Sequence, residues 1–460
     1  MGGGVAGLSS ALALARTGRT VVLLERDDGR PAGESADDVF DGWQRPGVPH
    51  FRQPHNFWAL ARELLLEHAP DVLAAVVELG ALENRQYELL PGDPEDADAS
   101  LVSLCVRRPV FELALRRALE REPAVTIEGG TRAAGLLADE ADSNGVRVIG
   151  AVTDRGDEVR AGLVVDALGR SSPVVSWLEE LGAPAPPERR SPCGLLYYSR
   201  HFRFRPGVEM PVVPSLTRGP RGDMGYLGFA VFVEDNRTFS LVLTIATWER
   251  ELRALRREAA YTAAALAIPS LVPWVHPDQV EPITPVLPMG SLQNMHRSLV
   301  VDGVPVATGV QPIGDALCHT NPTFAFGAPM ALRHAFALAA TAGDGDPRAV
   351  ALAFDEAVDA DAASRYEAVS SDDLDRDRLW RGEPVDVGPA FFVRTTVYPL
   401  AGEDAGLFRA VARRVNLLDP VDALERDEEL VERARRLAAA ADPPAPAGPP
   451  RERLLELIAE

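Results

Sequence analysis

The chain has 460 residues and a formal net charge of -21, from 47 basic and 68 acidic side chains. Its length allows two or three domains with substantial cores. Its acidity argues against nucleic acid or an anionic membrane as a partner, because either requires a basic surface. Every basic side chain is an arginine, which excludes mechanisms that form a Schiff base on a lysine.

The first predicted elements follow a glycine-rich turn that fits G-x-G-x-x-G. Its glycines are Gly2, Gly4 and Gly7. Such glycines allow a tight turn, the approach of a pyrophosphate and close packing of the next helix. Residues 8–17 predict that helix, which ends at Gly18. The apolar run 21–24 predicts a strand that ends in Glu25, whose carboxylate is placed to hold a ribose hydroxyl. Arg26 is assigned to the same cofactor site.

The rest of the chain alternates helix and strand patterns. Residues 27–54 predict a long loop punctuated by Gly and Pro. Predicted helices cover 56–68, 71–79 and 107–122, and predicted short strands cover 125–127, 146–152 and 158–165. Residues 193–248 predict antiparallel strands, whereas the chain is largely helical from residue 328 onward. An α/β nucleotide-binding domain is therefore interrupted by a sheet and then resumed.

The cysteines and the hydropathy indicate the cellular setting of the protein. Cys105, Cys193 and Cys318 are far apart and form no CxxC pattern. This favours a reducing, cytoplasmic setting and predicts no metal site. No stretch of the sequence approaches the roughly 18 apolar residues that a membrane span needs, so we expect no membrane span.

Three separated motifs carry the functional signal. The glycine turn is followed by DALGRSS at 166–172 and by GDALCHTNP at 314–322. In this order the motifs resemble the flavin-dependent monooxygenase family that contains p-hydroxybenzoate hydroxylase, whose relatives in fold include geranylgeranyl reductases and flavin-dependent halogenases. The resemblance covers about the first 345 residues. It implies a Rossmann-like FAD-binding domain, an inserted antiparallel-sheet substrate domain and a helical C-terminal tail.

On this resemblance we expect a discontinuous arrangement of domains. The segments are the FAD-binding domain in three parts (1–80, 105–185 and 286–345), a substrate-domain excursion (81–104), the substrate sheet domain (186–285) and the helical C-terminal region (346–460).

The resemblance also assigns residues to the cofactor. In the middle motif Asp166 and Gly169 match positions where the backbone passes close to the flavin nucleotide. In the third motif Gly314 and Asp315 match, and Asp315 is expected to accept a hydrogen bond from a ribityl hydroxyl. Arg108 matches an arginine that contacts the nucleotide. By contrast, Arg107, Arg116 and Arg117 are expected to be solvated.

The end of the third motif is expected to face the flavin ring. Pro322 and Gly327 match the family's proline and the second glycine of its pair. The helix that begins near Ala328 would direct its N-terminus at the pyrimidine end, where the helix dipole stabilises anionic reduced flavin.

This motif also departs from the family pattern. Cys318 stands where histidine is usual, with His319 displaced by one, and Ala325 and Pro329 replace a glycine and an asparagine. We interpret Cys318 as a buried small hydrophobe and His319 as a supporting residue. These departures bear on the contacts at the flavin ring and on the type of oxygen chemistry.

The substrate side is predicted from strand alternation. Tyr198 and Arg200 should share one face of the inserted sheet, with Tyr197 on the other. An aromatic face beside an arginine suits a planar or carboxylated substrate. Packing against helices explains the aromatic residues equally well.

The resemblance implies an FAD-dependent monooxygenase that transfers one oxygen from a flavin hydroperoxide to a small organic substrate, with aromatic compounds as one class of candidate. NADH or NADPH would be the reductant, or a separate flavin reductase would be a partner. A flavin-dependent reductase or dehydrogenase of a C=C bond is an alternative, as is a flavin-binding protein without turnover. Halogenation is disfavoured, because the lysine that the halogenases use is absent from the chain. No catalytic residue is assigned.

One element expected of this fold is missing from the sequence. The glycine turn should follow an apolar central strand of about 5–6 residues, but only Met1 precedes Gly2. We therefore expect that the natural start lies upstream of Met1. The alternative is a sheet with a gap and little affinity for flavin.

Overall fold

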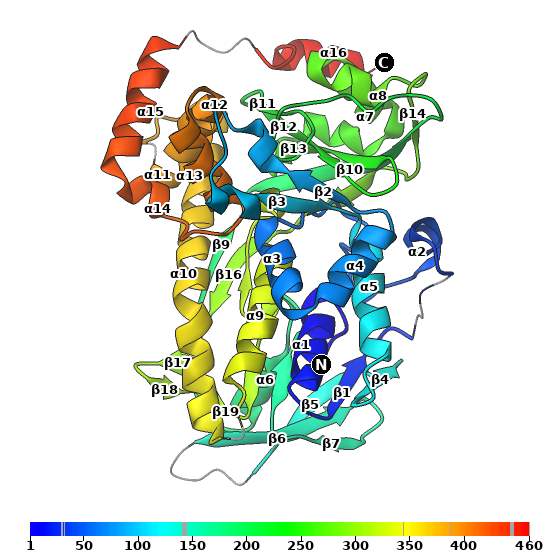
Figure 1. Cartoon of the computed structure of the whole chain (residues 1–460), viewed down its shortest axis with the longest axis vertical. Helices are drawn as coiled ribbons and strands as arrows, with labels where there is room; N and C mark the ends of the chain where they lie inside the picture. Colours follow the sequence, from blue (N-terminus) through cyan, green and yellow to red (C-terminus); the bar gives the residue numbers. More distant parts are fainter. Residues whose placement is uncertain are drawn as a thin grey trace.

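The computed structural model describes every residue except 29, 30, 32, 140–144, 344, 387, 442–445 and 460. Figure 1 shows two bodies, one around the helices α1 (Val5–Arg16) and α9 (Gly327–Thr341) and one around a sheet near the C-terminus. The long helix α10 (Pro347–Trp380) runs along both bodies. None of the helices formed by the described residues combines the length and the apolarity needed to cross a bilayer.

The first body has the expected strand–helix order. The strand β1 (Val21–Glu25) pairs in parallel with β4 (Val125–Gly129), and β8 (Val164–Asp166) pairs in parallel with β20 (Val310–Pro312). Met1 and Gly2 lie between these pairs, because the amide of Gly2 donates to Leu24 O and the amide of Ala167 donates to Met1 O. The expectation of a further strand upstream stays a prediction.

Apolar side chains hold α1 between two other helices. Leu8 and Leu12 are spaced by one helical turn and are almost fully buried. They belong to one cluster with Leu332 of α9 and Val110 of α5 (Arg108–Glu120). This packing fixes the N-terminal end of α1 at the edge of the strands.

Two predictions for this body were wrong in detail. The predicted strand 158–165 is two strands, β7 (Glu158–Arg160) and β8, because β7 pairs antiparallel with β6 (Val146–Thr153) while β8 joins β20. The predicted loop 27–54 contains the helix α2 (Ala36–Gly42), which Ser35 and Asp38 begin with a capping box. Residues 29, 30 and 32 of that loop lie outside the described residues.

The second body is built on an antiparallel sheet. Its strand order is β11 (Arg221–Asp223), β12 (Leu227–Val233), β13 (Thr238–Ala246), β10 (Leu195–Phe204) and β14 (Val280–Pro282), and β15 (Leu287–Met289) also pairs with β10. One face is covered by α7 (Glu258–Leu266), α8 (Val272–Val275) and the terminal helix α16 (Arg451–Ala459). The sheet predicted over 193–248 forms the centre of this body.

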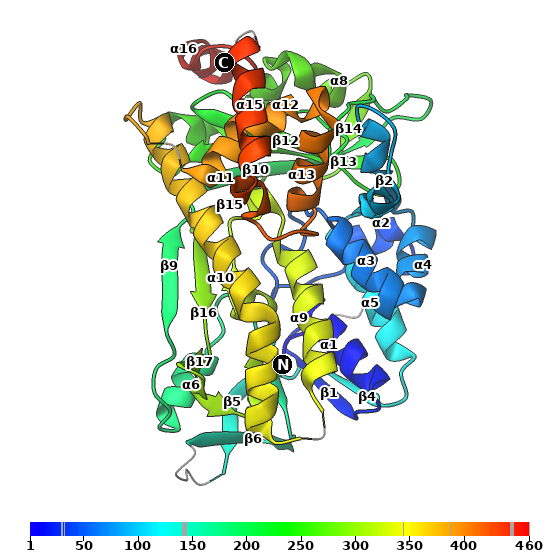
Figure 2. The same cartoon turned by 60° about the vertical axis from the view of Figure 1, so that its left-hand side comes forward.

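The C-terminal region returns to both bodies. Figure 2 shows α10 crossing the whole height of the molecule and α15 standing beside the second body. The helices of this region are α11 (Pro389–Phe392), a π-helical turn (Val393–Val397), α12 (Tyr398–Leu400), α13 (Ala405–Val415), α14 (Ala423–Arg426) and α15 (Glu428–Ala440). The proposed domain boundaries at 80, 104, 185, 285 and 345 remain predictions.

The remaining elements connect these parts. They are α3 (Ala59–His68), α4 (Pro70–Glu78), α6 (Val174–Glu180), β2 (Leu82–Arg85), β3 (Val102–Cys105), β5 (Ala133–Ala138), β9 (Glu188–Pro192), β16 (Gln293–Arg297), β17 (Val300–Val301), β18 (Val304–Pro305), β19 (Ala307–Thr308) and β21 (Cys318–His319).

Candidate cofactor and substrate site

The glycine turn is tightly packed where the motif requires it. Gly2 has a φ of +92°, and a Cβ there would lie 2.4 Å from Ala167 O. A Cβ on Gly7 would lie 1.7 Å from Gly2 O, so any larger residue would push α1 off the turn. Gly4 precedes α1, and no described side chain caps the helix there. The amides at this end are therefore available for an anion.

The carboxylate of Glu25 closes the same turn. Its Oε2 accepts a hydrogen bond from the amide of Gly3 at 2.6 Å, and its Oε1 accepts from the amide of Asp27 at 2.8 Å. Arg45 Nη2 lies 3.0 Å from Oε2. Arg26, predicted to bind the cofactor, is exposed. The end of β1 thus presents its acidic group to the glycine turn, as the ribose-binding prediction requires.

Arg45 was not predicted as a site residue. Its buried guanidinium bridges carboxylates from three segments, with Asp27 Oδ2 at 3.2 Å and Glu112 Oε2 at 3.0 Å in addition to Glu25. It also donates to Gly3 O at 3.0 Å. No local pattern marks this arrangement, because the partners are far apart along the chain.

Arg108 lies at the first turn of α5, as the resemblance implied. Its Nε donates to Glu112 Oε1 at 2.7 Å, and its Nη1 lies 3.3 Å from His55 Nε2. A Cβ on Gly4 would lie 3.4 Å from Arg108 Nη2, so the guanidinium reaches the glycine turn. The prediction for Arg107 was wrong. It is 1 % exposed and pairs with Asp235 at 2.6 Å, because it precedes α5 and points at the second body.

The middle motif forms a self-contained turn at the end of β8. Asp166 is buried and accepts hydrogen bonds from the amide of Leu168 at 3.0 Å and from Ser172 Oγ at 2.7 Å. Burial raises the pKa of this carboxyl group above its usual range. Gly169 has a φ of +79°. The Asp166 side chain thus shapes the turn, while the backbone at Ala167 contacts the glycine turn.

The third motif is fixed between α1 and α9. Gly314 has a φ of +57°, and a Cβ there would lie 2.9 Å from Ala6 Cβ. The amide of Gly314 donates to His334 Nδ1 at 3.1 Å. These contacts direct the next residue, Asp315, at the N-terminal end of α9, where a Cβ on Gly327 would lie 3.6 Å from its Oδ1.

Asp315 is an ionised carboxylate in an enclosed position. Burial opposes its ionisation, but the charges of His319, His50 and Arg108 outweigh burial and lower its pKa. His319 Nδ1 lies 3.2 Å from Asp315 Oδ2, and 23 % of the Asp315 side chain is still accessible. His319 Nε2 is buried and has no hydrogen-bond partner among the described residues.

Two further histidines of the 45–55 loop were not predicted as site residues. His55 donates from Nδ1 to Gln53 O at 2.7 Å, which leaves Nε2 as the acceptor for Arg108. Burial and the charge of Arg108 lower the pKa of His55 to about 3, so the ring is neutral at physiological pH. His50 stacks on it with ring centroids 5.9 Å apart. Both rings belong to the sequence run between Arg45 and His55, and the only available signal was that clustering.

The loop before α9 adopts a constrained backbone. Pro322 begins a 3₁₀ turn that Asn321 caps, and Ala325 has a left-handed conformation with a φ of 53°. The helix α9 then begins at Gly327, beside the predicted Ala328, and no described side chain caps it. Ala325 stands where the resemblance places a glycine, and glycine adopts this left-handed conformation freely. Burial raises the pKa of the Cys318 thiol to about 12, as befits a buried small hydrophobe.

The sheet places the predicted substrate residues on the covered face. Tyr198 packs in the cluster beneath α7 and α8, and Arg200 donates to Glu258 Oε2 at 2.6 Å and to Thr284 O at 2.9 Å. The predicted alternation was right, but the face was the wrong one, because helices that follow the sheet in sequence cover it. The substrate role predicted for Tyr198 and Arg200 does not fit this placement.

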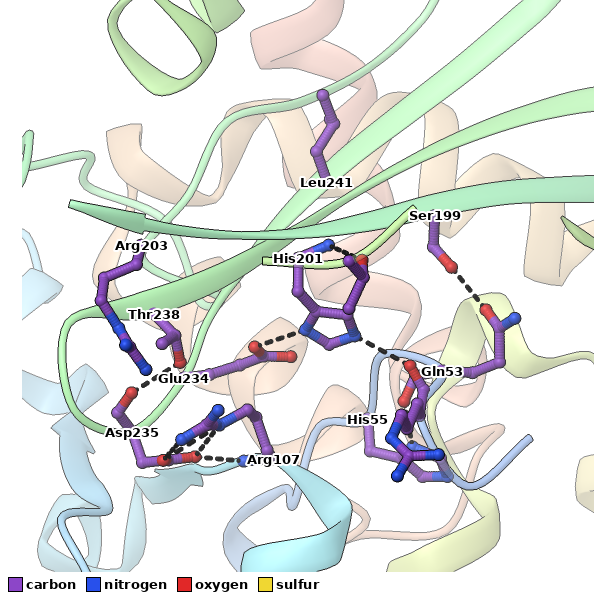
Figure 3. A network of polar contacts seen from close by, with 12 residues as sticks. Gln53, His55, Arg107, Ser199, His201, Arg203, Glu234, Asp235, Thr238 and Leu241 are labelled. Carbon is purple, nitrogen blue, oxygen red and sulfur yellow. Dashed lines mark hydrogen bonds and ion pairs between the residues drawn. The ribbon is translucent and has the colours of Figure 1, made fainter. Parts of the chain in front are cut away.

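The opposite face of the sheet points at the 45–55 loop and at the loop before α9. Ser199 Oγ donates to Gln53 Oε1 at 2.5 Å, and His201 Nε2 lies 2.8 Å from Arg52 O. Figure 3 shows Ser199 and His201 on one side of the sheet and Leu241 on the other. Tyr197 Oη contacts Thr323 Oγ1 at 2.5 Å and also bonds to Asn321. This face therefore lies against the 45–55 loop and the loop before α9.

An acidic side chain completes the network around His201. Its Nδ1 lies 2.9 Å from Glu234 Oε2, while its Nε2 faces the carbonyl of Arg52. The two ring nitrogens thus link the carboxylate of β12's following residue Glu234 to the backbone of Arg52. The pair anchors the 45–55 loop to the second body (Figure 3).

Together these features define a protein with a glycine-rich turn and an uncapped helix N-terminus at α1, an arrangement that suits a dinucleotide. A family model described as DAO, FAD dependent oxidoreductase, matches residues 1–239. The match spans more than half of the 460 residues, and the chain belongs to this family of FAD-dependent oxidoreductases.

Known proteins resemble the chain beyond that region. Protein Rv3254 of Mycobacterium tuberculosis (strain ATCC 25618 / H37Rv) is 27% identical over 362 residues, which cover 72% of this chain and 69% of that protein. A mutant of PqsL from P. aeruginosa matches with a TM-score of 0.57 and 18% identity over 89% of this chain and 98% of its own. The flavin-dependent brominase Bmp2 matches with a TM-score of 0.57 and 17% identity over 95% and 97%. These structures share the fold.

The residues present fit FAD. The uncapped end of α1, the glycine cradle that any Cβ would fill and the guanidinium of Arg108 suit a pyrophosphate. Asp315 offers a partly accessible carboxylate, and His319 Nε2 adds a buried nitrogen without a described partner. The assignment of individual cofactor-binding residues remains a prediction.

Proposed function

We propose that the chain is an FAD-dependent monooxygenase that adds one oxygen atom to a small organic, aromatic substrate. The observation that carries this proposal is the closure of the ring end of the site. Tyr197, Ser199 and His201 bond to the loop before α9 and to the 45–55 loop. Oxygen transfer requires that water be kept from the reacting group, and this closure supplies that protection.

The proposed roles of the residues follow from their positions. Glu25 would hold the adenosine ribose, and the amides of the glycine turn with Arg108 would bind the pyrophosphate. Asp315 would accept a hydrogen bond from the ribityl chain, and the N-terminus of α9 would stabilise negative charge on the ring. When bound, FAD supplies the two-electron chemistry and the reaction with dioxygen.

The comparisons support oxygen transfer as the reaction. One structure with this fold is described as PqsL, a probable FAD-dependent monooxygenase, with a TM-score of 0.55 and 17% identity. Another is a mutant of 2-methyl-3-hydroxypyridine-5-carboxylic acid oxygenase, with a TM-score of 0.53 and 16% identity over 87% of this chain and 96% of its own. The latter is named for a pyridine compound, which favours the aromatic substrate class proposed here.

The source of electrons is a further part of the proposal. NADH or NADPH would reduce the flavin directly, and a separate flavin reductase is the alternative donor. Cys105, Cys193 and Cys318 are buried free thiols. Free thiols support the proposal of a reducing, cytoplasmic setting.

The test begins with the absorption spectrum of the purified protein. We expect bound FAD and, with a substrate, oxidation of NADH or NADPH that consumes oxygen. Under ¹⁸O₂ the product should carry one labelled oxygen atom by mass spectrometry. Anaerobic turnover on a C=C bond without oxygen uptake would instead identify a reductase. A colourless protein that takes up no FAD would overturn the proposal.

A further inference from the structure

His50 lies in a turn of the 45–55 loop and carries a ring with two unused nitrogens. The amide of Gln53 donates to His50 O at 3.1 Å, which closes the turn. The ring is partly exposed and stacks on His55, but it makes no hydrogen bond to any residue that the structure describes. An imidazole inside a protein ordinarily has a partner on at least one nitrogen. Both nitrogens of His50 are therefore free to bind a ligand.

The charged groups around this ring come from three other segments. The charges of Arg108 on α5 and of Asp315 before α9 act on the His50 imidazole, as do those of His55 and of His319 in β21. Arg108 Nη1 lies 3.3 Å from His55 Nε2, and His319 Nδ1 lies 3.2 Å from Asp315 Oδ2. Arg108 is expected to contact the pyrophosphate, and Asp315 is expected to contact the ribityl chain. These two parts of FAD are joined directly, so His50 lies beside the path that the cofactor takes between them.

His55, by contrast, already uses both of its ring nitrogens. Its Nδ1 donates to Gln53 O at 2.7 Å (Figure 3), and its Nε2 accepts from Arg108. Glu112 Oε1 accepts from Arg108 Nε at 2.7 Å, so these two contacts leave Nη2 of the guanidinium for the glycine turn. A second proton on His55 would break its contact with Arg108. Of the two stacked rings, only His50 is able to accept a proton without losing a hydrogen bond.

The protein's own groups keep the His50 ring neutral. Burial and the charge of Arg108 lower the pKa of His50 well below its usual value of 6.5, and the charge of Asp315 opposes them only in part. A pyrophosphate that links two organic groups carries two negative charges. An opposite charge within about 4–6 Å favours the charged form of a titratable group. A pyrophosphate at the glycine turn would therefore offset the charge of Arg108 and favour the imidazolium form of His50.

We propose that His50 binds the pyrophosphate of FAD as an imidazolium, so that the binding of FAD takes up a proton from the solvent. The proton goes to a ring nitrogen of His50, which then donates a charge-assisted hydrogen bond to a phosphate oxygen. The chain has no lysine, and Arg45 is already paired with three carboxylates, so His50 supplies the second cation beside Arg108. This inference rests on the proposed function, and it adds that the affinity for FAD falls as the pH rises.

The proton can be counted on the full-length protein without any substitution. Apoprotein is titrated calorimetrically with FAD at about pH 7 in PIPES and in Bis-Tris, whose ionisation enthalpies differ, and the dependence of the binding enthalpy on the buffer gives the count. We expect about 0.3–1 proton per FAD. ADP-ribose, which shares the pyrophosphate, should also take up a proton, whereas riboflavin, which lacks it, should take up none. A count of zero for FAD, or an equal count for riboflavin, would overturn the proposal.

Substitutions then assign the proton to one ring. The wild-type dissociation constant for FAD should rise between about pH 6 and pH 8, by at most about tenfold per pH unit. In His50→Gln the amide still donates a hydrogen bond but carries no charge, so the dissociation constant should be about tenfold higher at low pH and should no longer change with pH. His276→Gln is the matched control and should behave like wild type, because His276 is an exposed histidine of the second body. Uptake that persists in His50→Gln but vanishes in His319→Gln would place the proton on His319 and overturn the proposal.

The same titrations separate this inference from the proposed function. FAD that binds without proton uptake would overturn the role of His50 alone, and transfer of ¹⁸O to a product would still be expected. A folded apoprotein that binds no FAD would overturn the proposed function. The proton count uses the unsubstituted protein, so it decides the role of proton uptake even if a variant does not fold.

Discussion

Asn321 Nδ2 donates to Asp373 Oδ1 at 2.5 Å, which ties the loop before α9 to the long helix α10. Asn294 Nδ2 donates to the other oxygen of Asp373 at 2.9 Å, and Arg376 Nη1 also bonds to this carboxylate. All four side chains are buried. One carboxylate of the C-terminal region therefore sets the position of the segment that the resemblance places at the flavin ring.

Replacing Asp373 should destabilise the fold strongly. Asp373→Ala leaves Arg376 buried without its partner, and the free energy of unfolding should fall by about 3–5 kcal/mol. Leu374→Ala is a control on the same helix, because Leu374 is 46% exposed. Denaturant unfolding followed by circular dichroism measures both variants. Equal stability of the two would contradict the role given to this carboxylate.

Ala325→Gly should stabilise the protein slightly. The left-handed backbone is unfavourable for alanine by about 1–2 kcal/mol, and glycine adopts it freely at the expense of a more flexible unfolded chain. We expect a net gain below about 1 kcal/mol, seen as a higher melting temperature. Ala337→Gly within α9 should have the opposite sign, since glycine weakens a helix interior by about 1 kcal/mol. A lower melting temperature for Ala325→Gly would count against the conformation described.

Glu25→Ala should weaken FAD binding. The lost charge-assisted hydrogen bond to the ribose corresponds to about 1–3 kcal/mol. Arg45 keeps Asp27 and Glu112 as partners, so the turn should survive the change. Fluorescence titration of the apoprotein with FAD measures the affinity, and Glu25→Gln should retain part of it. An unchanged dissociation constant would remove the ribose role from Glu25.

Asp315→Ala should lose flavin while the protein still unfolds cooperatively. The carboxylate is expected to bind the ribityl chain, while His319 stays in β21, which pairs with β16, and His50 stays stacked on His55. The ratio of flavin to protein absorbance after gel filtration gives the occupancy. Stoichiometric FAD in the variant would contradict the assignment of the third motif.

His334 should make stability depend on pH. Burial and the charge of Arg333 lower its pKa to about 4 in the native protein, from 6.5 in the unfolded chain. As the pH falls below about 6.5 the unfolded chain binds a proton first, so native stability is lost down to about pH 4, by about 3 kcal/mol. His334→Gln lacks this loss. Denaturant unfolding should therefore show that the free energy of unfolding of wild type, relative to that of His334→Gln, decreases between pH 7 and pH 4. A constant difference between the two proteins would refute the prediction.

The cofactor half of the site could be foreseen because its signals are local. The glycines, Glu25 and the two later motifs stand at the ends of strands, where parallel strands bring short motifs to one edge. Arg45 was not predicted as a site residue, because its partners Asp27 and Glu112 belong to segments that only the fold brings together. No periodic pattern marks such a junction.

The substrate half of the site was harder to predict from the sequence, for a different reason. Alternation along β10 correctly separated Tyr197 from Tyr198, but it cannot tell which face will be covered. That choice is made by α7, α8 and α16, which follow the sheet at varying distances along the chain.

The length of α10 determines how a substrate can reach the site. Its 34 residues span about 50 Å as one continuous helix. It contacts α9 and β16 along its course, and Arg376 near its C-terminal end also bonds to Cys193 O. Because α10 is one continuous helix that contacts both bodies, it resists hinge opening between them. The 45–55 loop bonds to the sheet through Ser199 and His201. With the two bodies joined by α10, we expect substrate to enter and product to leave by local movement of this loop.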